Sequence, residues 1–225
     1  MSKKISLQVT GLKSIISFDL DGTLVDFSFV NSIWLEGIPR MFAEKEKIPL
    51  DSARELLKKE YDNVGMEKLE WYNIRYWLKK FGLREDWRPL FESYKSRVKM
   101  YPEALDVLEK LKSENFTLIL VTNSPEEFLA IELEETGIRR FFSHIFSATS
   151  EFGQVKNTTD FYLKIASIVD VSPERIIHVG DNWNFDYEIP KKTGMTTYFL
   201  DRANQREDEW VVHDLKEFEK KLFLL

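Results

Sequence analysis

Three short runs of mostly apolar residues, each followed by polar residues, are the clearest pattern in the chain. They span 15–18, 116–121 and 176–179, and isoleucine and valine are frequent in them. Runs of this length without a polar face are typical of strands buried on both sides, as in a parallel sheet. Weaker runs predict further strands near 144–146, 197–199 and 210–212.

Helical patterns lie between the predicted strands. The apolar residues of 102–112 fall on one helical face, and those of 160–169 predict a second helix. Ser124 and Pro125, followed by two glutamates, predict that another helix begins directly after the second strand. This alternation of strand and helix predicts an α/β fold, with a Rossmann-like doubly wound parallel sheet and helices on both of its faces.

Residues 26–98 behave differently from the rest of the chain. They show no convincing strand, and four of the six tryptophans lie there. Their patterns predict helices at about 29–46, 51–61, 67–81 and 86–98. We therefore predict a core made of 1–25 and 99–225, with an all-helical cap domain at 26–98 packed over the carboxyl edge of the sheet.

The aromatic residues of the predicted cap recur at near-helical spacing, which is more typical of a helical core than of a ligand site. The most regular of them are Trp34, Phe42, Trp71, Tyr72, Trp77 and Phe81. Two arginines, Arg40 and Arg75, are candidates for contacting an anionic part of a substrate, but no pattern selects them. The sequence does not reveal which cap residues contact the substrate.

Composition and charge exclude several classes of protein. The chain has 225 residues, a formal net charge of −6, no cysteine and three scattered histidines. Disulfides, thiolate zinc sites and cysteine nucleophiles are therefore excluded, and the histidines do not suggest a metal cluster. The negative charge, with no run of basic residues longer than a pair, argues against nucleic acid or a membrane as the main partner. The first residues have no signal-peptide pattern, so we expect a cytoplasmic protein.

The candidate chemistry lies directly after the predicted central strands. The carboxyl ends of parallel strands meet at one edge of a sheet, so five polar side chains are expected to gather there. They are Asp19, Asp21, Thr122, Asn123 and Asp181. Carboxylates this close repel one another unless a cation lies among them, and oxygen ligands favour Mg²⁺. The absence of cysteine or histidine nearby disfavours zinc.

The two aspartates after the first strand suit phosphoryl transfer. A carboxylate such as Asp19 attacks phosphorus when a metal reduces the repulsion between them. The carboxyl group of Asp21 can protonate the leaving oxygen and then deprotonate the water that opens the aspartyl-phosphate. Thr122 and the backbone N–H groups after it can hold phosphate oxygens, and Lys156 can complete the charge balance.

The motifs resemble those of a known family. The seven residues from Asp19 to Val25 resemble the first motif of the haloacid dehalogenase superfamily, whose most common members are phosphatases. In the same order, 120–123 is similar to the second motif, Lys156 to the third and 180–186 to the fourth. The match covers about 12–25 and 99–215, and 26–98 lies where that family places its cap.

The resemblance implies a role for each matched residue. Asp19 would be the nucleophile and Asp21 the general acid and base. Thr122, with Asn123 beside it, would bind the transferring phosphoryl group, and Lys156 would bridge that group and the nucleophile. A carboxylate at position 21 favours phosphoryl transfer, because the dehalogenases of the family lack one there.

The resemblance also implies the metal ligands. Asp181 would ligate Mg²⁺ together with Asp19 and the backbone carbonyl of Asp21, and Asp186 would support these ligands. Simpler interpretations remain for single residues: Lys156 as a surface lysine, Asp186 as a helix-start acid, and His178 as a residue of the core rather than a catalyst.

The sequence thus predicts a magnesium-dependent phosphatase that hydrolyses a small phosphomonoester, such as phosphoglycolate or a sugar phosphate, through an aspartyl-phosphate. We expect a small phosphorylated metabolite as its ligand and a monomer or homodimer. Two alternatives stay open. A phosphomutase shares these motifs and returns the phosphoryl group to a sugar hydroxyl, and a non-catalytic phosphate-ligand binding protein could keep the fold.

Overall fold

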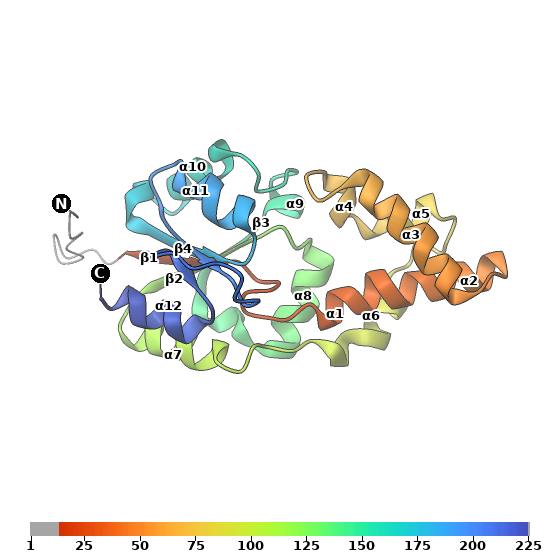
Figure 1. The fold of residues 1–225 in the computed structure, drawn as a ribbon, viewed down its shortest axis with the longest axis horizontal. Coiled ribbons are helices and arrows are strands. Elements are labelled where there is room, and N and C mark those ends of the chain that lie inside the picture. Colours follow the sequence, from red (N-terminus) through yellow and green to blue (C-terminus); the bar gives the residue numbers. More distant parts are fainter. Residues whose placement is uncertain (1–13, 225) are drawn as a thin grey trace.

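A computed structural model describes residues 14–224, so positions 1–13 of the predicted core lie outside the described residues. Six parallel strands form one sheet in the order β3-β2-β1-β4-β5-β6 (Figure 1). They are β1 (Ile15–Phe18), β2 (Thr117–Thr122), β3 (Phe142–Ser147), β4 (Ile176–Gly180), β5 (Thr196–Leu200) and β6 (Val211–Val212). All six strands lie at or next to the runs predicted from the sequence.

The register of the central strands decides which residues meet at the carboxyl edge. Phe18, the last residue of β1, is aligned with Leu120 of β2 and Val179 of β4. The residues that follow these three positions therefore lie side by side. The residues that follow β1 lie in the middle, because β1 is paired with β2 on one side and β4 on the other.

Helices cover both faces of the sheet, which confirms the predicted fold class. One apolar cluster joins the sheet to α7 (Ala104–Ser113), α8 (Glu126–Thr136) and α12 (Leu215–Leu222). A second cluster joins the other face to α10 (Thr159–Ile168) and α11 (Ile189–Lys191). Shorter elements complete this part of the chain: η3 (Ile138–Phe141), α9 (Ala148–Glu151), η4 (Pro173–Arg175) and the π-helical η5 (Trp183–Glu188).

Between β1 and α7 the chain is helical, and these helices lie beyond the carboxyl edge of the sheet (Figure 1). They are α1 (Ser28–Asn31), the π-helical η1 (Ser32–Gly37), α2 (Ile38–Glu46), α3 (Leu50–Val64), α4 (Leu69–Tyr72), α5 (Ile74–Lys80), α6 (Arg88–Tyr94) and η2 (Lys95–Arg97). They surround their own apolar cluster, which includes Phe29, Trp77 and Phe91 and to which α8 contributes Phe128.

Two helix boundaries differ from the prediction for local reasons. The helix expected at 67–81 is interrupted at Asn73, whose Oδ1 accepts a hydrogen bond from the backbone N–H of Tyr76 (3.0 Å) and caps α5. The helix after β2 begins at Glu126 rather than at Pro125, because Pro125 has an extended backbone (ψ 158°). The hydroxyl of Ser124 instead donates to Glu132 (3.5 Å). No helix within 14–224 has the length and apolar character needed to cross a membrane.

Candidate active site

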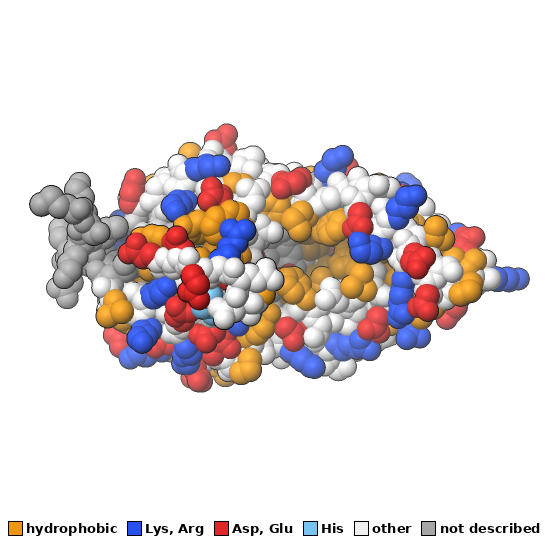
Figure 2. All heavy atoms as spheres, viewed as in Figure 1, with side chains coloured by type: hydrophobic (Ala, Val, Ile, Leu, Met, Phe, Trp, Pro, Cys, Tyr) orange, Lys and Arg blue, Asp and Glu red, His pale blue; other side chains and the backbone are white. Residues whose placement is uncertain are grey.

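A cavity of about 470 Å³ lies between the carboxyl edge of the sheet and the helices of 28–97. The space-filling view shows a hollow in the middle of the molecule with hydrophobic side chains around it (Figure 2). All seven site residues predicted from the sequence line this cavity: Asp19, Asp21, Thr122, Asn123, Lys156, Asp181 and Asp186. The structure therefore brings together residues from four separate motifs.

Lys156 links two of the carboxylates at the floor of the cavity. Its side chain is 2% exposed, and its Nζ lies 2.5 Å from Oδ1 of Asp19 and 2.6 Å from Oδ1 of Asp186. The same ammonium group donates to the backbone oxygen of Val121 (3.1 Å). The backbone N–H of Lys156 donates to Oδ1 of Asn123 (2.8 Å), which fixes the loop that carries the lysine. Lys156 is thus a buried member of the site and not a surface lysine.

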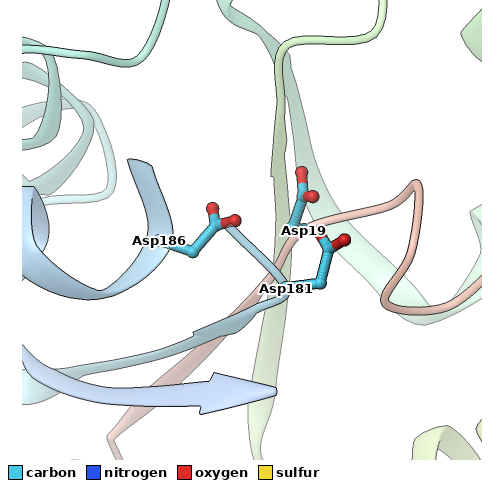
Figure 3. A group of neighbouring side chains, drawn as sticks. All are labelled: Asp19, Asp181 and Asp186. Atoms are coloured by element: carbon cyan, nitrogen blue, oxygen red, sulfur yellow. The ribbon is translucent and has the colours of Figure 1, made fainter. Parts of the chain in front are cut away.

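Asp19, Asp181 and Asp186 form a cluster in which one carboxylate oxygen of each lies within 4.8 Å of the others (Figure 3). Burial raises the pKa of Asp19 to about 7, although Lys156 opposes the shift. Burial also raises the pKa of Asp181, and the negative charges of Asp19 and Asp186 add to the effect. When ionised, these three carboxylates and Lys156 carry two unbalanced negative charges. An all-oxygen donor set with this charge fits a divalent cation such as Mg²⁺.

Both carboxylate oxygens of Asp186 have partners in the site. Its Oδ1 contacts Nε2 of His178 (3.0 Å) as well as Lys156, and its Oδ2 accepts from the backbone N–H of Asn182 (3.0 Å). Burial alone would raise the pKa of Asp186, but Lys156 and His178 outweigh it and lower this pKa to about 2. A Cβ atom at Gly180 would lie 2.4 Å from Cγ of Asp186, so the close approach of strand and carboxylate requires glycine there.

His178 supports the cluster from inside the sheet, a role that the sequence did not indicate. It is fully buried in β4, with Nδ1 2.7 Å from the hydroxyl of Ser17 and Nε2 directed at Asp186. Burial lowers the pKa of His178, which favours the neutral ring. A neutral ring with the proton on Nε2 donates to Asp186 and accepts from Ser17. A histidine in an otherwise apolar strand was the only sign of this contact.

Asp21 faces a second buried acid, Glu132 of α8, which sequence reasoning missed. Glu132 is fully buried on the side of α8 that carries Phe128 and Leu133. Burial raises the pKa of both Asp21 and Glu132. Within the described residues, Oδ1 of Asp21 and Oε1 of Glu132 have no hydrogen-bond partner, so a proton shared by the pair would satisfy both. The sign in the sequence was a glutamate on an apolar helical face.

The loop after β2 closes one side of the site. The backbone N–H of Ser124 donates to Oγ1 of Thr122 (2.9 Å), so the hydroxyl proton of Thr122 remains available for the cavity. Asn123 donates through Nδ2 to the hydroxyl of Tyr72 (3.3 Å), which connects this loop to the helices of 28–97.

The aromatic residues predicted as cap core divide into two groups. Trp77 and Phe81 are buried inside the helical block, as the prediction had it. Trp34, Trp71 and Tyr72 line the cavity. Trp34 and Trp71 also pack against the apolar cluster of the helical block, as does Phe42. Arg40 and Arg75 are not among the described lining residues, and Arg75 lies 3.5 Å from Glu127.

Comparison with known proteins shows the family of the chain. Residues 13–194 match the family described as haloacid dehalogenase-like hydrolase. This match covers well over half of the chain, and the chain therefore belongs to the haloacid dehalogenase-like hydrolase family. Curated relatives named phosphoglycolate phosphatase support its place among the phosphatase-like hydrolases of that family.

Two curated relatives illustrate the range of names among similar sequences. The chain is 28% identical over 167 residues to the GMP/IMP nucleotidase YrfG of Escherichia coli K12, covering 74% of this chain and 73% of that protein. It is 29% identical over 191 residues to the phosphoglycolate phosphatase of Aquifex aeolicus, covering 81% and 82%.

Solved structures share the fold. The HAD phosphatase from Thermococcus onnurineus superposes with a TM-score of 0.82 at 24% identity, covering 94% of this chain and 98% of that one. The putative HAD-hydrolase YfnB from Bacillus subtilis superposes with a TM-score of 0.67 at 22% identity, covering 94% and 99%. At these identities the likeness concerns the fold alone.

Proposed function

We propose that this hydrolase is a magnesium-dependent phosphatase that hydrolyses a small phosphomonoester through an aspartyl-phosphate on Asp19. The observation that carries the proposal is the position of Asp19. It follows the central strand β1 on the floor of the cavity, and the ammonium group of Lys156 lies 2.5 Å from its Oδ1. A carboxylate held beside a buried ammonium group at the base of a cavity is placed to attack a phosphoryl group that enters the cavity.

The first half of the reaction transfers the phosphoryl group to Asp19. A carboxylate oxygen of Asp19 forms a bond to phosphorus while the bond from phosphorus to the ester oxygen breaks. Lys156 offsets negative charge on the phosphoryl oxygens, and the hydroxyl of Thr122 donates a hydrogen bond to one of them. Asn123 acts beside Thr122 and holds the backbone of Lys156 in place.

Asp21 supplies the proton in this half-reaction and recovers it in the next. Because burial raises its pKa, Asp21 can enter the reaction protonated and donate to the leaving oxygen. Its carboxylate then accepts a proton from the water that attacks phosphorus, which breaks the bond to Asp19 and releases phosphate. Asp21 also supports a phosphatase over a dehalogenase, since the resemblance assigns a carboxylate at this position to phosphoryl transfer.

Asp19 and Asp181 would hold the Mg²⁺, with the backbone carbonyl of Asp21 as a further ligand and Asp186 in support. When bound, the ion reduces the repulsion between an anionic nucleophile and an anionic substrate. In this arrangement Asp181 contributes a carboxylate oxygen to the cluster, whereas the carboxylate of Asp186 already contacts Lys156 and His178. Asp186 therefore mainly supports the ligand set.

The helices of 28–97 lie over the site, which supports a division into a core of 1–25 and 99–225 and a cap domain of 26–98. Closure of the cap would exclude bulk water during transfer. Relatives named as a nucleotidase and as phosphoglycolate phosphatases support a small phosphorylated metabolite as substrate.

Phosphate release from a panel of phosphomonoesters, with and without Mg²⁺, tests the proposal. Native protein should release phosphate only with Mg²⁺, and Asp19→Asn should abolish release, whereas the exposed Asp106→Asn should not. Release that survives Asp19→Asn would contradict the assigned nucleophile. Loss of a sugar phosphate without release of phosphate would indicate a phosphomutase. No turnover of any ester, with ligand binding retained, would indicate a binding protein.

A further inference from the structure

The far end of the cavity differs from the catalytic end in its chemistry. The catalytic end is lined by carboxylates and Lys156, whereas the end formed by α8 and the helices of 28–97 is mostly apolar and aromatic. Its apolar lining residues include Trp34, Leu35, Trp71 and Phe128. The cavity volume of about 470 Å³ lies within the ~300–1,000 Å³ usual for sites that hold drug-sized ligands. The space is therefore larger than a two-carbon alcohol needs.

The ring of Trp34 is held in place from behind, and the backbone of Trp71 is tied to the helical block. Trp34 stacks on Phe128, with ring centroids 5.6 Å apart and an interplanar angle of 16°. Tyr61 packs edge-on against Trp34 at 5.8 Å and donates its hydroxyl proton to the backbone oxygen of Trp34 (3.4 Å). The backbone oxygen of Trp71 accepts from Nε1 of Trp77 (3.2 Å). Both cavity-lining tryptophans are half-buried, so each keeps part of its ring surface uncovered.

The backbone that carries Trp34 is unusual. Trp34 and Leu35 lie in η1, a π-helical turn between the α-helical segments α1 and α2. Such turns are rare and occur frequently at functional sites, since they change the direction of a side chain without ending the helix. Here the π-helical turn places one aromatic and one aliphatic side chain of the same segment on the cavity.

Charge at this end does not suit an acidic substrate tail. Among the described lining residues the cations are Lys58 and Lys156. Lys156 is bound to Asp19 and Asp186, and Nζ of Lys58 lies 2.5 Å from Oδ2 of Asp62, which lines the same cavity. A carboxylate buried among aromatic rings without a cation of its own is strongly disfavoured. The apolar end therefore favours an uncharged group.

We infer that the substrate is a phosphomonoester whose alcohol carries a flat, uncharged aromatic ring of nucleobase size, held against Trp34 and Trp71. This inference rests on the proposed phosphatase function and adds the substrate class. The phosphate lies at Asp19 and Lys156, and the ring fills the apolar end of the cavity. Flat rings bury a large apolar area against indole rings at little cost in conformational entropy.

A pair of esters with the same reacting oxygen tests this inference. Inosine 5′-monophosphate and ribose 5-phosphate both carry the phosphate on a primary hydroxyl, and only the first has a ring base. We expect kcat/KM for the nucleotide to exceed that for the sugar phosphate by about tenfold or more, as for one base stacked on an aromatic side chain. Phosphoglycolate should be a poorer substrate than either. Equal kcat/KM values for the nucleotide and ribose 5-phosphate, or a higher kcat/KM for phosphoglycolate, would overturn the inference.

Variants at the cavity wall test which residues hold the ring. Trp34→Leu and Trp71→Leu should each lower kcat/KM for the nucleotide about tenfold and leave ribose 5-phosphate within about twofold. For Trp34→Phe, which keeps an aromatic ring, kcat/KM for the nucleotide should lie between the values for native protein and for Trp34→Leu. Trp87→Leu is the matched control, because Trp87 lies in the same helical block but does not line this cavity. An equal loss for both esters in the Trp34 and Trp71 variants would contradict ring recognition.

Binding measurements separate this inference from the proposed function. If no ester is hydrolysed, the proposed phosphatase function is wrong. Titration calorimetry of the native protein with inosine 5′-monophosphate and with ribose 5-phosphate still shows whether the cavity binds the ring. Binding of the nucleotide at least tenfold tighter than ribose 5-phosphate would support the ring site, and equal affinities would overturn it.

Discussion

The ammonium group of Lys156 lies 2.5 Å from Oδ1 of Asp19, although 137 positions separate the two residues in the chain. Both side chains are almost completely buried. Such a pair stabilises the protein only while both partners are present, because either charge alone would be buried without compensation. The same ammonium group also contacts Asp186, so a single cation holds two acids of the cluster.

Replacement of Lys156 by methionine should therefore affect both stability and activity. Because buried carboxylates lose their cation, we expect the free energy of unfolding to fall by about 3 kcal/mol at pH 8 without Mg²⁺. The deficit should shrink at pH 5, where the carboxylates take up protons. The rate of phosphate release should fall by about 10²-fold or more. Urea unfolding and steady-state assays measure these effects, with the exposed Lys112→Met as control. Similar losses in both variants would contradict a specific role for Lys156.

Asp21→Asn should separate the two halves of the proposed reaction. An amide cannot donate a carboxylic proton or deprotonate water, so turnover should fall by about 10²- to 10⁴-fold. With an ester whose leaving group needs no protonation, such as an aryl phosphate, transfer to Asp19 should persist and the covalent form should accumulate. Mass spectrometry of acid-quenched protein should then show one added phosphoryl group, which the double variant with Asp19→Asn lacks. Turnover by Asp21→Asn at a rate close to that of the native protein would show that Asp21 is not the general base.

The floor of the site could be predicted from the sequence, because it depends on local pattern and on one rule of topology. Asp19, Thr122 and Asp181 end or follow short apolar strands, and the carboxyl ends of parallel strands meet at one edge. Lys156 lies in a loop with no such pattern, and only its position relative to the other motifs suggested it. His178 and Glu132 escaped prediction, because their partners are set by the packing of strands and helices distant in sequence.

The cavity wall could not be predicted for a different reason. Trp34, Trp71 and Trp77 have similar helical spacing, yet Trp77 is fully buried in the helical block while the other two line the cavity. A helix in this block has one face toward its neighbours and another toward the site, and both faces are apolar. Periodicity identifies an apolar face but not what covers it.

Without divalent cations, stability should fall as the pH rises from about 5 to about 8. Burial raises the pKa of Asp19 from 3.8 to about 7, so the folded protein binds this proton more tightly than the unfolded chain does. The stabilising contribution is complete below about pH 4 and is lost as the pH rises through 7, by ~1–4 kcal/mol. Asp186 does not contribute in this window, because its pKa is lowered to about 2.

Urea unfolding in a chelating buffer at pH 5 and pH 8 measures this effect. Asp19→Asn should reduce the fall, whereas the exposed Asp106→Asn should leave it unchanged. Added Mg²⁺ should stabilise the native protein more at pH 8 than at pH 5, because the ligands must lose their protons to bind it. An identical pH dependence in native and Asp19→Asn protein would rule out Asp19 as the source.

Arg202 positions the turn that carries Asp21. Its Nε donates to the backbone oxygen of Gly22 (3.0 Å) and one terminal nitrogen to that of Thr23 (2.7 Å), while the other pairs with Glu103 (2.8 Å). Arg202→Met should lower kcat about tenfold with little change in KM, and lower stability by about 1–2 kcal/mol. Arg206→Met is the control, because Arg206 stacks on a tryptophan outside the cavity, Trp183. An unchanged kcat would show that the turn holds its shape without Arg202.

Glu67 is one contact through which the turn between α3 and α4 rests on the loops beside the site. Its Oε2 accepts from Nδ2 of Asn157 (2.9 Å), and Nδ2 of Asn184 lies 3.5 Å from its Oε1. Glu67→Ala should make the closed arrangement less favourable and raise KM about two- to tenfold with kcat nearly unchanged, the effect of one or two hydrogen bonds at an exposed contact. Steady-state kinetics with the exposed Glu70→Ala as matched control measures this change. Equal KM values in the two variants would show that Glu67 does not hold the helices of 28–97 against the loops beside the site.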